Sequence, residues 1–363
     1  MKVGIMTFWW TKNNYGQILQ LYALQQYLKN HTHDVVVIPY KFENDYIRTN
    51  KKINFAHIKR FFLFKITTTL GSLGNNKRKF DQFRRNHIDL GQYSYCTYND
   101  LKKSPPEIQA MIVGSDQVWN FNEEQKSILN AYFLDFGNTR TKRISYAASF
   151  GKIKINRQFM DIVKEKLNNF DYVSVRENSG KKLCDKLSIQ SEVVCDPTFL
   201  HSKEFYFKIS DDYPHKKNMR YCLLYLLEGE TKFNYKNLKK WCKEKNIKIL
   251  YVSANNRFDL HRKIYPNVGQ WLSLIKNAAY IVTNSFHCAV FSIIFNKQFV
   301  VLKRKGNGEE MNTRFLTLFS KFSINQFCEN DDYDILDRKI YNDFVKSVIE
   351  KNINSFDLSK VGM

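Results

Sequence analysis

The residues in this chain that could carry chemistry follow short apolar runs, as polar side chains do where a strand ends. Residues 283–287 (TNSFH) join an apolar run to a second, helix-like run. Ser285 or Asn284 is expected to cap that helix, which places His287 in its first turn. The helix dipole there disfavours an imidazolium and favours a bound anion, so His287 is a candidate for proton transfer. A purely structural histidine is the alternative.

A second candidate is residues 114–120 (GSDQVWN), which follow the apolar run 110–113. Asp116 at a strand end could act as a general base or hold a sugar hydroxyl. Trp119 could stack on a sugar ring, with Gln117 between the two. The alternative for Asp116 is a helix N-cap.

The first apolar run of the chain is followed by Asn14, Tyr15 and Gly16. A glycine lets a ligand approach the backbone closely. The helix that follows would direct its N-terminus at a bound anion. The segment lacks the GxGxxG pattern, so a dinucleotide site is not indicated. A simple capping loop is the alternative.

Cations stand at further strand ends. Arg176 follows the run 172–175, and its planar guanidinium suits a carboxylate or a phosphate. The alternative is a surface pair with Glu177. Lys303 and Arg304 follow the run 299–302 and Arg314 opens a later helix, which suits an anion or, alternatively, a solvated loop. Asp196, after another short run, is interpreted as a structural turn residue.

The elements that would position these groups alternate between strands and helices. A strand at 3–8, a helix at 17–28 and a strand at 35–38 form a βαβ unit, which requires parallel strands. Ligands bind such sheets at the carboxyl ends of the strands. Further strands are expected at 110–113, 143–148, 172–175, 192–195, 221–227, 248–252, 279–282 and 299–302. Helices are expected at 157–168, 179–187, 233–245, 269–278, 286–295 and 335–351.

Residues 211–218 are polar and resemble a linker between two such series. We therefore expect an α/β fold of two Rossmann-like domains facing a cleft, as in GT-B glycosyltransferases. The N-terminal domain would span 1–210, with the acceptor side and part of the active site. The C-terminal domain would span 211–330, on the donor side. A C-terminal helix within 331–363 would pack back on the first domain.

The net charge of +22, from 57 basic and 35 acidic residues, favours anionic partners. No zinc-finger, RNP or recognition-helix pattern accompanies it, so nucleic-acid binding is not expected. The seven cysteines are odd in number and form no CxxC pair, which argues against disulfides and structural zinc and indicates a cytoplasmic location. No signal peptide or membrane-spanning run is seen. The apolar residues 61–64, after Lys59 and Arg60, could dock on the anionic inner face of a membrane.

Several of these segments, in this order, resemble the polysaccharide pyruvyl transferase family. The matching stretches are 14–16 (NYG) with 22–28 (YALQQYL), 114–120 (GSDQVWN), 145–151 (SYAASFG), 174–177 (SVRE), 196–198 (DPT), and 283–287 (TNSFH) with 291–297 (FSIIFNK). The family pattern around the histidine resembles T-D-S-F-H-G. Here Asn284 replaces the acidic residue and Cys288 the glycine.

The resemblance implies a phosphoenolpyruvate donor and a pyruvate ketal formed across two hydroxyls of a sugar, which is free, lipid-linked or polymeric. His287 is then expected to transfer the proton, and Asp116 to act as base or to align a hydroxyl, with Arg176 completing the catalytic set. The expected donor-binding residues are Arg176, Asn284, Ser285, Lys303, Arg304 and Arg314. The expected acceptor-binding residues are Asn14, Tyr15, Gly16, Gln117 and Trp119. The chemistry requires no metal or cofactor, and no metal-ligand spacing is seen.

Two other functions remain open from the sequence. One is a nucleotide-sugar-dependent glycosyltransferase on the same fold. The other is a non-catalytic basic scaffold for polysaccharide assembly at the membrane.

Overall fold

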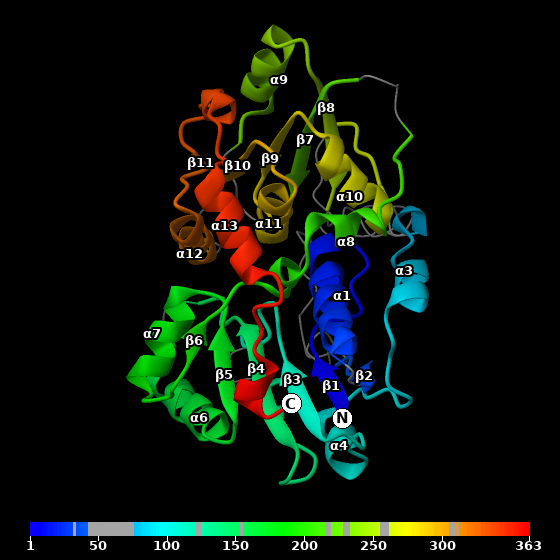
Figure 1. Ribbon diagram of the computed structural model, residues 1–363, viewed down its shortest axis with the longest axis vertical. Helices are drawn as coiled ribbons and strands as arrows, with labels where there is room; N and C mark the ends of the chain where they lie inside the picture. Colours follow the sequence, from blue (N-terminus) through cyan, green and yellow to red (C-terminus); the bar gives the residue numbers. More distant parts are fainter. Residues whose placement is uncertain are drawn as a thin grey trace, which may run out of the picture.

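Two parallel sheets, each flanked by helices, make up the computed structural model of the chain (Figure 1). The structure describes residues 1–31, 34–42, 76–120, 125–152, 155–214, 219–227, 233–254, 261–304, 310 and 312–363. The predicted α/β fold of two Rossmann-like units is therefore confirmed. No helix in these ranges is long and apolar enough to cross a membrane.

The first sheet has six strands in the order β2-β1-β3-β4-β5-β6. They are β1 (Lys2–Met6), β2 (Asp34–Val37), β3 (Ala110–Val113), β4 (Lys142–Ala148), β5 (Tyr172–Val175) and β6 (Glu192–Val193). All four residues of β3 are buried, because helices cover both faces of a parallel sheet. The helices between β1 and β7 in the chain are α1 (Tyr15–Asn30), α3 (Phe80–His87), α4 (Tyr98–Lys103), α5 (Lys126–Tyr132), α6 (Arg157–Leu167), α7 (Asn178–Lys186), η3 (Pro197–Leu200) and α8 (Lys203–Phe207), of which α8 packs on α10 of the second sheet.

The second sheet has five strands in the order β11-β10-β9-β7-β8. They are β7 (Tyr221–Leu226), β8 (Lys248–Ser253), β9 (Tyr280–Thr283), β10 (Phe299–Leu302) and β11 (Phe327–Cys328). Its helices are α9 (Tyr235–Glu244), α10 (Val268–Asn277), α11 (Phe286–Ile294) and α12 (Thr313–Phe322), followed by η5 (Asp334–Asp337), α13 (Asp343–Asn352) and η6 (Leu358–Val361).

The long helix predicted at 335–351 is wrong. Residues 334–337 form η5, and α13 begins only after Asn342, whose side chain accepts a hydrogen bond from the Val345 N–H. Between them the chain is held by Gln298, which donates to the Arg338 carbonyl at 2.5 Å and accepts from the Ile340 N–H at 3.4 Å. This contact with a distant residue breaks a segment whose apolar spacing is helical. The prediction also missed β11 and the extent of α12.

One hydrophobic cluster contains residues of both sheets, and each sheet packs a further cluster of its own. Helix α1 packs on α11. Tyr15 of α1 stacks on Trp271 of α10, with ring centroids 5.1 Å apart. After α13 the chain returns to the first sheet (Figure 1), where the Tyr27 hydroxyl donates to the Phe356 carbonyl at 2.7 Å. The domain boundaries at 210 and 330 stay predictions. The apolar residues 61–64 lie outside the described residues.

Candidate active site

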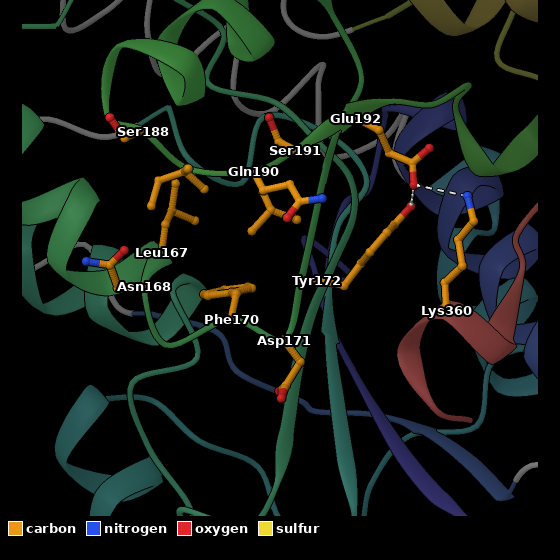
Figure 2. Close-up of a pocket in the computed structure, with 12 residues that line it drawn as sticks. Leu167, Asn168, Phe170, Asp171, Tyr172, Ser188, Gln190, Ser191, Glu192 and Lys360 are labelled. Atoms are coloured by element: carbon orange, nitrogen blue, oxygen red, sulfur yellow. Dashed lines mark hydrogen bonds and ion pairs between the residues drawn. The ribbon is translucent and has the colours of Figure 1, made fainter.

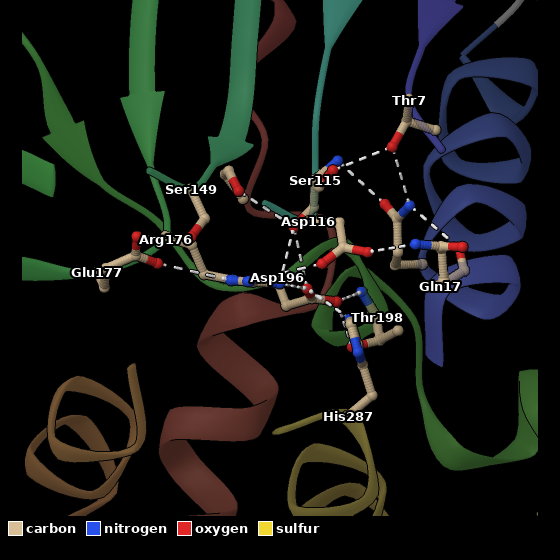
Figure 3. A network of polar contacts seen from close by, with 12 residues as sticks. Thr7, Gln17, Ser115, Asp116, Ser149, Arg176, Glu177, Asp196, Thr198 and His287 are labelled. Atoms are coloured by element: carbon tan, nitrogen blue, oxygen red, sulfur yellow. Dashed lines mark hydrogen bonds and ion pairs between the residues drawn. The ribbon is translucent and has the colours of Figure 1, made fainter. Parts of the chain in front are cut away.

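A buried network of polar side chains lies where the strand ends of the two sheets meet (Figure 3). Asp116 follows β3, Arg176 follows β5 and Asp196 follows β6, all in the first sheet. His287 comes from the second sheet, because it lies in the first turn of α11 after β9. Residues more than 100 positions apart thus converge on one place, as parallel strands require.

Asp196 is the centre of this network, and its side chain is fully buried. Its Oδ2 lies 3.0 Å from the Ser115 hydroxyl, 3.2 Å from Arg176 Nη1 and 3.3 Å from His287 Nε2. Its Oδ1 accepts from Thr198, from the N–H at 3.1 Å and the hydroxyl at 2.8 Å. Burial alone raises the pKa of a carboxyl, but His287, Arg176 and the Thr198 N–H outweigh it and hold the pKa of Asp196 below its ordinary value. Asp196 is therefore a buried carboxylate.

His287 is positioned by its helix and by a glycine of the opposite domain. Ser285 caps α11 by accepting from the Cys288 N–H at 3.4 Å, as predicted for one of the two candidate caps. Gly16 of α1 packs directly on the imidazole. A Cβ at Gly16 would lie 2.2 Å from both Cβ and Cγ of His287. Only a residue without a side chain lets α1 and the histidine approach this closely.

Arg176 lies among three carboxylates and an aromatic ring. Besides Asp196, its guanidinium is 4.0 Å from Asp116 and 3.7 Å from Glu177. It sits 4.5 Å from the centroid of the Phe286 ring. Burial lowers its pKa, but the three carboxylates raise it above the ordinary value. Its Nε and Nη2 make no hydrogen bond within the described part of the chain, so both can still donate to a ligand.

Asp116 is held in an uncommon backbone conformation. Its φ is +76°, in the left-handed region that few non-glycine residues occupy. Its Oδ2 accepts from the Gln17 side chain at 3.0 Å. The preceding Gly114 has φ +122°, and a Cβ there would lie 2.1 Å from the Tyr146 carbonyl oxygen. Such conformations persist where the surroundings enforce them, which is common at functional sites.

Two further arginines add positive charge beside this network. Arg314 of α12 is buried, and its guanidinium lies 5.6 Å from the same Phe286 ring. Its Nε has no hydrogen-bond partner among the residues described. Burial, together with Arg176 and Arg304, lowers the pKa of Arg314 to about 9. Buried Arg304 is anchored through its main chain, which exchanges two hydrogen bonds with Asn312. Three arginines thus face the three carboxylates, and the guanidinium N–H groups of Arg176 and Arg314 that lack an acceptor among the described residues are the groups that could bind an anion.

The sequence of the chain matches the polysaccharide pyruvyl transferase family across residues 14–306, a range that includes Gly16, Asp116, Arg176, Asp196 and His287. The chain belongs to the polysaccharide pyruvyl transferase family. It is therefore a transferase. No curated protein matches the chain by sequence.

Solved structures show the fold that this pyruvyl transferase shares. It is similar to a putative UDP-N-acetylglucosamine 2-epimerase from Listeria monocytogenes, with a TM-score of 0.56, 7% identity and coverage of 99% of this chain and 93% of the other. It also resembles the S. aureus MnaA–UDP co-structure (TM-score 0.50, 11% identity, coverage 99% and 94%). The Rickettsia bellii UDP-N-acetylglucosamine 2-epimerase is similar too (0.50, 11%, 99% and 97%). These likenesses confirm the GT-B-like pair of Rossmann domains.

Of the residues predicted for the site of this pyruvyl transferase, the structure brings one group together. His287, Asp116 and Arg176 belong to the network, Gly16 packs on His287, and Arg314 lies near the same Phe286 ring as Arg176. Arg304 is near enough to Arg314 to lower its pKa. Ser285 caps the helix that carries His287. These placements agree with the predicted roles without testing them.

Other predicted residues have different surroundings. The Trp119 indole is 1% exposed, stacks on Phe133 and donates to the Tyr132 carbonyl, so its face is not presented to a sugar. Tyr15 is also buried, and its hydroxyl donates to the Pro266 carbonyl at 2.6 Å. These aromatic rings build the core and the domain contact because aromatic side chains contribute large buried areas.

Three of the remaining predicted residues bind other groups of the protein in this structure, and Gln117 does not. Lys303 is exposed and pairs with Glu329. Asn284 accepts from the Leu227 N–H at 2.6 Å and donates to the Leu227 carbonyl at 3.2 Å, which joins β9 to the end of β7. Asn14 caps α1. Gln117 lies beside Gly151, and its Nε2 has no hydrogen-bond partner among the described residues.

Sequence reasoning missed the central residue of the site. Asp196 was interpreted as a structural turn residue, and Glu177 as half of a surface pair, yet both are buried beside Arg176. The available signal was position, because Asp196 follows a strand of the same sheet as Asp116 and Arg176. Ser115, which bonds Asp196, carried no separate signal.

A cavity of about 670 Å³ lies elsewhere, at the amino ends of β5 and β6 (Figure 2). Tyr172 and Lys360 both contact the Glu192 carboxylate there. The Glu192 carboxylate is therefore paired with the Tyr172 hydroxyl and the Lys360 ammonium. The cavity contains none of the candidate catalytic groups, which lie at the opposite ends of these strands.

Proposed function

We propose that this transferase moves the enolpyruvyl unit of phosphoenolpyruvate onto two hydroxyls of a sugar, in a surface polysaccharide or its precursor, forming a pyruvate ketal and releasing phosphate. The observation that carries this proposal is the pair of buried guanidinium groups over one ring, those of Arg176 and Arg314. Both have nitrogens without an acceptor in the described residues. An unsatisfied buried donor costs about 1–3 kcal/mol. A ligand with a carboxylate and a phosphate would remove that cost.

The proton-transfer chemistry follows from the position of His287 beside these arginines. As imidazolium it donates a proton to the methylene carbon of phosphoenolpyruvate, which leaves C2 cationic. The oxygen of one sugar hydroxyl bonds to C2 and loses its proton to a base. The C2–O bond to phosphate then breaks, the second hydroxyl oxygen bonds to C2, and its proton leaves with the phosphate or through the same base. One proton thus enters the new methyl group, and the other is carried by hydrogen phosphate.

Asp116 is the proposed base for the hydroxyl. Its Oδ1 lies 4.0 Å from Nη2 of Arg176. The hydrogen bond from Gln17 fixes its second oxygen. A carboxylate held by two groups and placed across from His287 can align a hydroxyl as well as accept its proton. The reaction as written needs only these protein groups.

The test combines ligand binding with product analysis. Phosphoenolpyruvate should raise the melting temperature of the wild type, and mass spectrometry should detect a ketal on an acceptor sugar. His287→Ala should abolish the product while retaining the shift, since Arg176 and Arg314 still bind the donor. No ketal with any of a panel of hexose and N-acetylhexosamine acceptors, combined with no shift, would refute the proposal.

A second candidate is a nucleotide-sugar glycosyltransferase. The observation in its favour is the shared fold with a protein solved with UDP. Its signature would be a melting-temperature shift with UDP-sugars and none with phosphoenolpyruvate. A protein that responds to neither and still assembles with polysaccharide enzymes would be the non-catalytic scaffold.

We further propose a cytoplasmic location against the anionic inner face of the membrane, with a lipid-linked acceptor. The support is the net charge of +22. Electrostatic docking is screened within about 10 Å at about 0.1 M salt, so high salt should release the protein from anionic vesicles. Equal binding to neutral vesicles would contradict it.

A further inference from the structure

We infer that Asp196 is a positioning residue that holds the His287 imidazole in place from across the boundary between the two sheets, as a fixed anionic partner for its proton-donating nitrogen. This inference rests on the proposed function of His287. It concerns a residue that touches neither the donor nor the acceptor in the scheme above and acts through the histidine.

The geometry supports Asp196 as the partner of His287. Asp196 belongs to the first sheet and His287 to the second, and the 3.3 Å between Oδ2 and Nε2 spans the boundary. Ser115 and Thr198 orient the carboxylate from both sides. A carboxylate that is fixed in this way cannot turn away when the histidine is neutral. Its negative charge therefore faces the ring nitrogen that would carry the proton.

The same oxygen also contacts Arg176, at 3.2 Å. One buried carboxylate thus contacts a guanidinium of its own sheet and an imidazole of the other sheet, and the second contact joins the two sides of the site.

Few other groups around the pair could titrate near neutral pH. The ionisable neighbours are Arg176, Asp116, Glu177, Tyr146, Tyr206, Cys195 and Cys288. Burial raises the pKa of both tyrosines and both cysteines, to about 12 for Cys288, so these four stay neutral. These four groups therefore do not contribute to a difference between variants measured near neutral pH.

The first experiment is a stability cycle that needs no substrate. Melting temperatures are measured for the wild type, Asp196→Asn, His287→Gln and the double variant, at about pH 6 and about pH 8, on either side of the ordinary histidine pKa. Breaking a buried pair should cost about 5 °C or more at the lower pH. The two substitutions should then be strongly non-additive at about pH 6 and less non-additive at about pH 8. Additivity at both values would overturn the inference.

Glu177→Gln is the matched control. Glu177 is an equally buried carboxylate, 3.7 Å from the same arginine, and its other oxygen accepts from Ser149. Its combination with His287→Gln should be additive at both pH values. If it is as non-additive as Asp196→Asn, the effect belongs to Arg176 and the inference fails.

Two further readouts complete the test. If Asp196→Asn does not fold, the melting temperature of the wild type relative to His287→Gln should still rise as pH falls from about 8 to about 6; a constant difference would refute the inference. In turnover assays, Asp196→Asn should move the alkaline limb of the kcat/KM profile to lower pH by about one to two units. Absence of any turnover would count against the proposed function, but the stability cycle would still be readable.

Discussion

Replacing Gly16 by alanine tests the contact between α1 and His287 most directly. The added Cβ would lie 2.2 Å from two atoms of the imidazole side chain and 2.4 Å from its Nδ1. Contacts this short do not occur, so the histidine or the helix must move. Because α1 and α11 are packed in one core, we expect a displacement of up to about 1 Å at the imidazole.

The expected effect on stability is small because two effects oppose each other. Alanine favours the helix over glycine by about 1 kcal/mol. Overpacking a well-packed site costs about 1–3 kcal/mol. The net loss is thus about 0–2 kcal/mol, a shift of a few degrees at most. A misplacement of about 1 Å at a reacting group costs about 100-fold in rate. Turnover should therefore fall about 100-fold in a protein that is still folded.

The assay is ketal formation from phosphoenolpyruvate, with melting temperatures measured in parallel. Gly180→Ala is the matched control, since Gly180 lies in the first turns of α7 and its added Cβ would meet only side-chain carbons, at 3.3 Å and beyond. Wild-type turnover in Gly16→Ala would refute the packing argument.

Four other predictions follow from single residues. Burial lowers the pKa of Arg314 to about 9, so its buried charge destabilises the folded protein at every pH below about 9. Arg314→Met should therefore raise the melting temperature of the ligand-free protein, and it should remove the melting-temperature shift produced by phosphoenolpyruvate. Trp119→Phe should cost about 1–3 kcal/mol of stability through the lost indole hydrogen bond and leave the acceptor KM unchanged; a raised KM would restore the sugar-stacking role. The Asn284 amide donates to the Leu227 carbonyl oxygen. In Asn284→Asp a carboxylate would face that oxygen, so the unfolding midpoint should fall at neutral pH and recover in acid, where the carboxyl is protonated and can donate. The carboxyl of Asp196 has a lowered pKa, so its ionisation stabilises the fold above about pH 4 and this contribution is lost as pH falls further; Asp196→Asn should show a flatter acid denaturation curve.

The sequence alone determined the strands and helices that flank the site. Residues 110–113 are wholly apolar and residues 172–175 are apolar except for Ser174; polar residues follow both runs, and the structure begins and ends β3 and β5 at those positions. The strand-end rule then selected Asp116, Arg176 and His287, because parallel strands bring their carboxyl ends to one edge. The local pattern predicts these strands correctly because the same apolar residues favour an extended backbone and fill the buried positions of the sheet.

Tertiary contacts decided what local pattern could not. Gln298 interrupts a helical apolar pattern at residues 338–340, and a distant partner has no trace in local periodicity. Trp119, which was expected to face a sugar, is buried in the core, whereas Asp196, which was expected to be a structural turn residue, lies at the centre of the polar network. A residue that follows a strand can turn either into the core or toward the facing sheet. The direction depends on which helices cover that edge. His287 gained its partner only because a second domain closes on the first and brings it within 3.3 Å of a carboxylate 91 positions earlier in the chain.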